Sequence, residues 1–208
     1  MKAGRSRHLA LSLLLAGLGA GCSILGPVST PTYYFSLAPM AEAQRAAAPL
    51  DNPGDPTFAL GPVTLPAYLD RNSVATRTSP TELAYSQIDY WAAPLAENIS
   101  NVMLQNLFVL LSTNRILTYP WVNNAKFDYQ IAVEILRFES NTSGECQLTA
   151  RWMILDGRTQ KTVLIRESHF TRAASAANTA AEVAALSATL GDLSEEIATT
   201  LRGLRKPT

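Results

Sequence analysis

Apolar and polar residues alternate in three long stretches of the second half of the chain, a pattern typical of half-buried β-strands. These stretches run over about 127–139, 146–156 and 161–171. Asp156 and Gly157, at the end of the second stretch, are typical of a tight turn. We therefore predict an antiparallel meander of three strands, which are long and so strongly twisted.

The alternation changes phase inside the first of these stretches. Apolar residues occupy odd positions up to Ile135, whereas Leu136 and Phe138 occupy even positions. An extra residue in one strand has this effect, so a β-bulge is predicted near Ile135 and Leu136. Shorter strands are expected at 32–37, 58–65, 74–78, 82–86 and 116–119, of which the third and fourth form a hairpin.

Two other stretches have apolar residues at steps of three and four, which is the period of an amphipathic helix. These helices are expected over about 94–113, with Pro94 in the first turn, and over about 179–203. Gly191 costs about 1 kcal/mol relative to Ala in a helix, which leaves open a break there. The stripe of the second helix suits packing on the sheet, or a coiled-coil seam in a homo-oligomer. It consists of Val183, Leu186, Leu190, Leu193, Ile197, Leu201 and Leu204.

Together these elements predict a single α/β domain over residues 32–205. Its sheet is expected to be mixed but mainly antiparallel and twisted, with the two main amphipathic helices packed on it. Residues 38–56 are rich in Ala and Pro, so a flexible insertion is expected there. Gly61 and Pro62 interrupt the strand at 58–65, which therefore belongs at a sheet edge or contains a bulge.

The beginning of the chain has the layout of a secretory signal peptide that ends at a cysteine. Three basic residues precede an uncharged apolar run over 9–20, and Gly21 and Cys22 follow it. The run has twelve residues, fewer than the ~20 that a transmembrane helix needs. Small residues directly before a cysteine are similar to a bacterial lipobox. We therefore expect removal of residues 1–21 and lipid attachment to Cys22.

Residues 22–31 are then expected to form a lipidated tether. Several acyl chains, each contributing ~0.8 kcal/mol per buried CH2, make a stable anchor, whereas one chain alone is marginal. Ser23 after the cysteine, rather than Asp, favours the periplasmic face of the outer membrane in a Gram-negative host. The inner membrane is the alternative.

Composition excludes some function classes. Three of the 17 Lys and Arg residues leave with the signal peptide, so 14 remain against 17 acids and the net charge of the mature chain is −3. A chain with this charge is not expected to bind nucleic acid. Once Cys22 is lipidated, Cys146 has no cysteine to pair with, so we predict that it is a small buried apolar residue.

The sequence contains no motif that indicates catalysis. His169 is the single histidine of the mature chain, and its place within a predicted strand favours a structural or surface role. There is no G-x-S-x-G elbow, no phosphate-binding glycine loop and no zinc-type His/Cys spacing. We expect a non-enzymatic protein without metal or cofactor, apart from the covalent lipid on Cys22. The alternative is an enzyme that uses paired acids without a signature motif.

One ordered set of motifs is more distinctive than composition explains. It comprises GPVTLPAYLDR over 61–71, WAAPLAENI over 91–99, YPW over 119–121, LRF over 136–138 and ARW over 150–152. In this order, behind the cysteine and Tyr33-Tyr34, the chain resembles the PqiC-like ABC-type transport auxiliary lipoprotein family over most of residues 32–205.

The resemblance implies a periplasmic α/β domain that is anchored in the outer membrane. It also implies a partner protein with an MCE domain, together with an inner-membrane permease and ATPase of the same system. Such a system moves lipids between the two membranes and contributes to membrane integrity. The expected function is that of a non-catalytic auxiliary subunit; the alternative is a structural or assembly lipoprotein of another cell-envelope complex.

Two roles are open for the most specific motifs. Tyr, Leu and Arg at a loop are residue types that anchor protein interfaces, so the motifs are candidates for partner docking. The other role is architectural: the prolines fix φ and lack an N–H, and the large apolar side chains cover the core. The candidate residues are Gly61, Pro62, Pro66, Tyr68, Leu69, Arg71, Trp91, Pro94, Leu95 and Asn98.

The lipid anchor gives a direct test of the N-terminal interpretation. We predict that Cys22→Ser abolishes acylation, so that the protein is released from membranes or its precursor stays uncut. Membrane fractionation and intact-mass spectrometry measure both outcomes. Normal membrane attachment of the Cys22→Ser protein would contradict the prediction.

Overall fold

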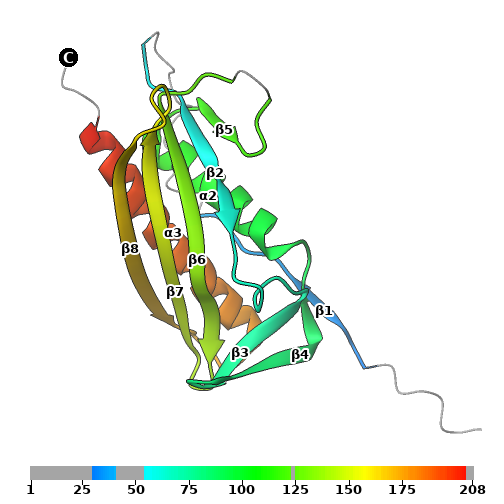
Figure 1. Cartoon of the computed structure of the whole chain (residues 1–208). Helices are drawn as coiled ribbons and strands as arrows, with labels where there is room; N and C mark the ends of the chain where they lie inside the picture. The colour runs from blue at the N-terminus through cyan, green and yellow to red at the C-terminus, as the bar shows by residue number, and fades with distance from the viewer. Residues whose placement is uncertain (1–29, 41–53, 123–124, 205–208) are drawn as a thin grey trace, which may run out of the picture. The chain divides into compact units, whose positions relative to one another are not determined.

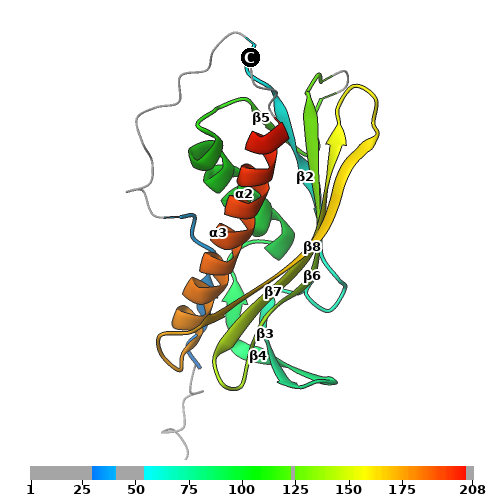
Figure 2. The same cartoon turned by 90° about the vertical axis from the view of Figure 1, so that its left-hand side faces the viewer.

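The computed structural model describes residues 30–40, 54–122 and 125–204 of the chain. From Thr32 onward these residues form one compact unit, a curved sheet with two helices on one of its faces (Figure 1, Figure 2). The predicted signal peptide and Cys22 lie outside the described residues. The elements are β1 Tyr33–Phe35, β2 Phe58–Thr64, β3 Ser73–Ser79, β4 Glu82–Trp91, α2 Leu95–Leu111, β5 Ile116–Thr118, β6 Tyr129–Asn141, β7 Glu145–Asp156, β8 Thr162–Ala173 and α3 Thr179–Leu204.

Strand β6 lies at the centre of the sheet. One of its edges pairs with β7, and β7 pairs in turn with β8; both pairings are antiparallel. The other edge pairs in parallel with two strands, with β2 near its beginning and with β3 at its end. The remaining strands extend these: β5 pairs with β2 in parallel, β4 pairs with β3 antiparallel, and β1 pairs with β4 in parallel.

The sheet is therefore mixed, and the prediction that it is mainly antiparallel was wrong. The meander β6–β7–β8 and the hairpin β3–β4 are confirmed as antiparallel pairs. The parallel pairs join strands that are far apart in the chain, such as β2 and β6. Turn residues indicate hairpins between sequence neighbours, whereas parallel strands require long crossover connections that leave no local signal.

Helix α3 packs its apolar stripe on the sheet. Six of the seven stripe residues are buried, and Leu190, Leu193, Ile197 and Leu201 have no exposed surface. The helix contacts β6, β7, β8 and α2, so the stripe is part of the core of one molecule rather than a coiled-coil seam. The helix continues through Gly191, where an added Cβ would lie 3.3 Å from Met40 Cγ. The glycine thus allows the segment after β1 to approach the helix closely.

Polar residues on the inner sides of the two helices bind the segment that follows β1. The backbone N–H of Met40 donates to Asn106 Oδ1 on α2 at 2.8 Å, and the N–H of Ala38 donates to Ser187 Oγ on α3 at 3.1 Å. Asn106, the polar exception in the stripe of α2, also donates to Ser194 Oγ across the helix pair. These polar side chains supply partners for backbone groups of an extended segment that has no neighbouring strand there.

Within the part of the chain that the structure describes, no helix is both long enough and apolar enough to cross a bilayer.

The burial of α3 predicts what a charge in its stripe does. We expect Leu193→Asp to prevent folding or to lower the free energy of unfolding by more than about 3 kcal/mol, because it places an unpaired charge in the core. Ala188→Asp, on the exposed side of the same helix, is the matched control and should change stability by less than about 0.5 kcal/mol. Chemical denaturation followed by circular dichroism measures both. Equal stability of the two variants would contradict this packing.

Candidate functional site

The GPVTLPAYLDR motif forms the end of β2 and the loop that leads to β3. Gly61 has a φ of 120°, in the region that favours glycine, and an added Cβ would lie 2.5 Å from Tyr119 Cβ. The ladder between β2 and β6 shifts register between Leu60 and Val63, so Pro62 lies in the predicted bulge. Strand β5 pairs with β2 only up to Leu60, so the proline faces no strand on that side.

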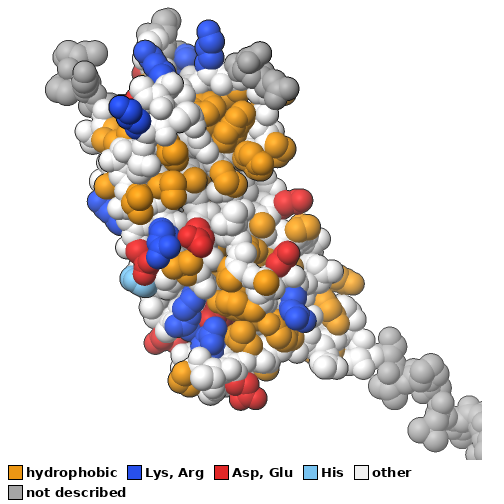
Figure 3. All heavy atoms as spheres, in the orientation of Figure 1, with side chains coloured by type: hydrophobic (Ala, Val, Ile, Leu, Met, Phe, Trp, Pro, Cys, Tyr) orange, Lys and Arg blue, Asp and Glu red, His pale blue; other side chains and the backbone are white. Residues whose placement is uncertain are grey.

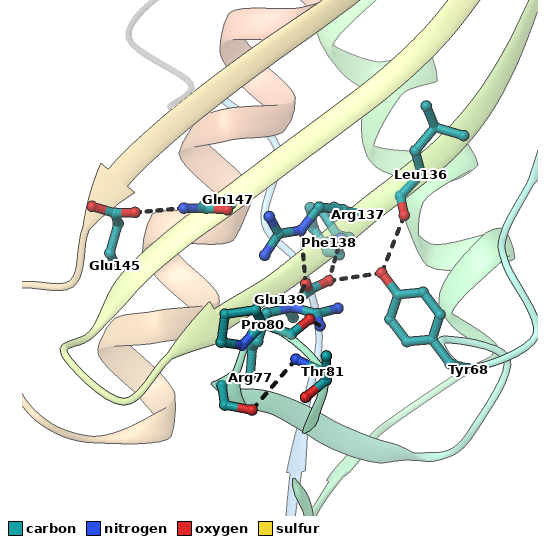
Figure 4. Close-up of polar contacts among 11 residues, drawn as sticks. Tyr68, Arg77, Pro80, Thr81, Leu136, Arg137, Phe138, Glu139, Glu145 and Gln147 are labelled. Atoms are coloured by element: carbon teal, nitrogen blue, oxygen red, sulfur yellow. Dashed lines mark hydrogen bonds and ion pairs between the residues drawn. The ribbon is translucent and has the colours of Figure 1, made fainter. Parts of the chain in front are cut away.

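Beyond the bulge of β2, the loop carries Tyr68 to a buried carboxylate, Glu139 (Figure 4). Tyr68 Oη lies 3.0 Å from Glu139 Oε2 and 3.1 Å from the carbonyl oxygen of Leu136, so its single O–H is shared between these two acceptors. Arg77 Nε on β3 donates to Glu139 Oε1 at 2.7 Å, and Arg137 Nε donates to the same oxygen at 3.0 Å. These side chains come from the loop, β3 and β6, so one carboxylate joins three segments. We call Tyr68, Arg77, Arg137 and Glu139 the Glu139 cluster.

The second bulge of the chain explains why this cluster forms here. The ladder between β6 and β7 shifts register between Ile135 and Arg137, which confirms the bulge predicted from the change of phase. A bulge leaves the extra residue, here Leu136, outside the ladder, and the Tyr68 hydroxyl supplies a partner for its carbonyl. Neighbouring side chains of a strand point to opposite faces, so Glu139 points away from the core that contains Phe138.

The protonation states within the Glu139 cluster complement each other. Burial raises the pKa of Glu139, but hydrogen bonds from Arg77, Arg137, the backbone N–H of Phe138 and Tyr68 outweigh it, and the pKa lies below its ordinary value. Burial and the charge of Glu139 raise the pKa of Tyr68 to about 12. At neutral pH an ionised carboxylate therefore accepts from a neutral phenol and two guanidinium groups, so the buried negative charge is paired and hydrogen-bonded.

The rest of the loop is held by apolar and aromatic contacts. Leu69 is 3% exposed and belongs to the core, while the Arg71 guanidinium lies 4.8 Å from the centre of the Tyr85 ring. Tyr85 Oη donates to the backbone oxygen of Tyr68 at 3.1 Å. Pro66 accepts a backbone hydrogen bond from Leu69. Arg71 is exposed, so it is a member of the motif that is accessible to a partner.

The second candidate motif adjoins the first. The backbone N–H of Trp91 donates to the oxygen of Asn72, directly after the first motif. Trp91 and Leu95 are buried in the core, and Pro94 precedes the first turn of α2. Asn98 is also buried, and its Oδ1 lies 3.4 Å from Ser36 Oγ. The geometry thus favours an architectural role for these residues, and partner docking stays a prediction.

Sequence reasoning missed the three charged members of the Glu139 cluster. Arg77, Arg137 and Glu139 stand on predicted strands where charged side chains are normally solvated. The bulge predicted near Ile135 and Leu136, three to four residues before Glu139, was the available signal. The loop that covers the carboxylate comes from a distant part of the chain, so no local pattern marked its burial.

The other candidate groups lie where the pattern placed them. His169 stands in β8, with Nδ1 3.1 Å from Thr149 Oγ1 and Nε2 3.4 Å from Glu167. Cys146 has no exposed surface, and burial raises the pKa of its thiol to about 11, which confirms its apolar role. In the described ranges, no three His, Cys, Asp or Glu side chains gather closely enough to hold a metal ion.

The order of motifs along this fold matches a known family. The sequence model of the ABC-type transport auxiliary lipoprotein component family matches residues 35–198, which include all the elements from β2 to β8 and most of α3. The chain belongs to this family. No curated protein is significantly similar to it in sequence.

Solved structures of similar fold support the architecture of this auxiliary lipoprotein. A crystal structure of an uncharacterised protein is 18% identical to it, with a TM-score of 0.67, over 83% of this chain and 99% of that one. A protein from Xanthomonas campestris, XCC0632, of the family DUF330, is 19% identical with a TM-score of 0.61, over 82% of this chain and 98% of that one. At such identity the likeness concerns the fold.

The Glu139 cluster predicts a specific loss of stability. Glu139→Gln should lower the free energy of unfolding by about 2 kcal/mol or more, because two guanidinium groups lose an ionised acceptor. Tyr68→Phe should cost about 1–2 kcal/mol. Glu134→Gln on the same strand, where the carboxylate is 53% exposed, is the control and should change stability by less than about 0.5 kcal/mol. Urea denaturation measures all three. Equal effects at positions 134 and 139 would contradict the assignment.

The pH dependence of the free energy of unfolding gives a second test of the role of Glu139. Because the folded state lowers the pKa of Glu139, its contribution is present above the ordinary value of 4.5 and is lost as the pH falls through the folded pKa. The stability difference between the wild type and Glu139→Gln should therefore shrink below about pH 4.5. A difference that stays constant from pH 7 to pH 3 would contradict this role.

Proposed function

We propose that this protein is a non-catalytic auxiliary subunit of an ABC-type lipid transport system of the cell envelope. It is anchored by lipid on Cys22 at the periplasmic face of the outer membrane and binds an MCE-domain partner. The observation that carries the proposal is the family match over residues 35–198, which includes nearly the whole described body. The signal-peptide layout and the small residues before Cys22 support the location.

The chemistry of the described residues supports a binding role rather than catalysis. In the Glu139 cluster the charged groups satisfy one another, so none of them is poised to accept or donate a proton at neutral pH. His169 lies on an exposed strand with its ring nitrogens near Thr149 and Glu167. The sequence also lacks a phosphate-binding loop, so ATP hydrolysis would belong to another subunit.

The architecture also suits a domain that binds a partner without catalysing a reaction. A single core holds both helices and the strands that pack on them, and the Glu139 cluster ties the most distinctive loop to two strands. A stiff domain on a membrane anchor can hold a partner at a defined place, which requires contact surfaces and no reacting groups. A structural or assembly lipoprotein of another envelope complex is the alternative function.

The partner decides between these functions. We expect the lipidated protein, cross-linked in cells and purified from native membranes, to bring with it an MCE-domain protein together with a permease and an ATPase. An unrelated lipoprotein of the same membrane, carrying the same affinity tag, is the control for non-specific recovery. Mass spectrometry identifies the captured proteins. Repeated capture of a different envelope complex, without any MCE-domain protein, would contradict the transport role and favour the alternative.

A further inference from the structure

Three segments meet at one end of the domain. The loop between β5 and β6 adjoins the β7–β8 turn, because the backbone N–H of Gly157 donates to the oxygen of Asp128 at 2.8 Å. Tyr129 Oη, at the start of β6, lies 3.4 Å from the oxygen of Leu204 at the end of α3. We call this end, together with the loop that leads to it from beside Leu60 of β2, the tip; it comprises residues 119–122, 125–128, 156–161 and 202–204.

Aromatic and aliphatic side chains are exposed at the tip. Tyr119 and Trp121 lie edge to face with ring centres 5.3 Å apart, and Trp121 lies 5.1 Å from Phe127 in a similar arrangement. Although the rings pack together, Tyr119 remains 57% exposed and Val122 remains 80% exposed. A valine this exposed has no role in the core of the domain, and together with Tyr119 it adds apolar surface to the outside of this loop.

The same end is positively charged. It has four basic residues, Lys126, Arg158, Lys161 and Arg202, all of them exposed. Its two acids are engaged in local structure: Asp128 lies 3.0 Å from Arg158, and the Asp156 carboxylate accepts from backbone N–H groups of the turn. Figure 3 shows Lys and Arg side chains gathered at this end, beside hydrophobic ones. The mature chain as a whole has a net charge of −3, so the positive charge of the tip is opposite in sign to that of the whole chain.

The tether enters the domain near the first residues of α3, whereas the tip lies beside the last residues of that helix. Tyr33, at the start of β1, pairs with Asp89, and Thr179 at the start of α3 donates to the Asp89 carboxylate at 2.9 Å. The tip adjoins the other end of that helix, at Leu204. With 26 residues, α3 is about 39 Å long. The chain from Cys22 to Thr32 can span at most about 35 Å, so both ends can reach one bilayer when α3 runs along it.

We propose that the tip is a second membrane contact, which inserts Tyr119, Trp121 and Val122 among the headgroups of an anionic phospholipid bilayer. Tyr and Trp are enriched at this depth of a membrane because their rings combine an apolar body with a polar group. The surrounding bases interact with lipid phosphates, at about 1 kcal/mol for each Lys or Arg near an anionic surface.

A lipid surface fits these observations better than an acidic protein does. A stable protein interface buries about 800 Å² on each partner, whereas the exposed apolar part of the tip consists chiefly of two side chains on one loop. A small insertion of this kind is sufficient beside a lipid anchor, because the anchor keeps the tip at a high effective concentration near the bilayer. The contact would orient the domain on the membrane, and it does not depend on the identity of the transport partner.

Tryptophan fluorescence tests the proposal on the complete lipidated protein. Trp91 is 6% exposed and Trp152 has no exposed surface, so Trp121 is the tryptophan that a bilayer can reach. The protein is reconstituted in vesicles of phosphatidylcholine with phosphatidylglycerol, with and without bromine on the acyl chains. We expect brominated lipid to quench Trp121 emission, and we expect Trp121→Phe to abolish that quenching. Raising the salt concentration should weaken it, because salt screens the basic residues from the headgroups.

Matched variants separate the tip from the rest of the surface. Tyr119→Ser with Val122→Asn, and separately Lys126→Gln with Lys161→Gln, should each reduce the quenching at least several-fold. Tyr34→Ser is the control, because Tyr34 is 69% exposed and lies on β1 at the other end of α3. Circular dichroism confirms that each variant is folded. Equal Trp121 emission in brominated and ordinary vesicles, or quenching that appears only when a protein partner is added, would overturn the proposal.

Discussion

Hydrogen bonding to β6 is the constraint on which the rest of the fold depends. The strand holds β2, β3 and β7 directly, and it holds β4, β5 and β8 through one neighbour. Two parallel strands share the second edge of β6: β2 pairs with its first part and β3 with its end. The loop between β2 and β3 therefore lies beside the bulge at Leu136. The bulge frees a backbone carbonyl there, and the loop supplies the Tyr68 hydroxyl to bind it.

This constraint also explains a buried charge on an otherwise ordinary strand. Glu139 accepts hydrogen bonds from Arg77, Arg137 and Tyr68, and so it joins the shared edge of β6 to both segments that meet there. Removing one partner of such a cluster is costly, whereas forming it adds little net stability, since each ion loses its hydration. Its value for this fold is therefore that it specifies one position of the loop. For the non-catalytic role that we propose, a fixed shape matters more than extra stability.

The two membrane attachments that we propose lie at opposite ends of α3. The tether joins the domain near Thr179, and the basic aromatic tip lies about 39 Å away along the helix, near Leu204. The family match supports a role beside an ABC-type transporter, and the tip adds a physical means of orienting the domain on a bilayer. An oriented domain would present one side of its sheet and helices to a partner, which a single point of attachment cannot ensure.

Local periodicity determined the elements of this protein, including the long α3, the meander β6–β8 and the bulge at Leu136, because each leaves a repeating pattern in neighbouring residues. It also determined that Cys146 is buried and that His169 stands on a strand. Only the tertiary structure decided that β2 and β3 pair in parallel with β6, that Glu139 is buried, and that Trp121 and Lys161 lie at the same end of the molecule. These features depend on contacts between segments far apart in the chain, and such contacts leave no periodic trace in either segment.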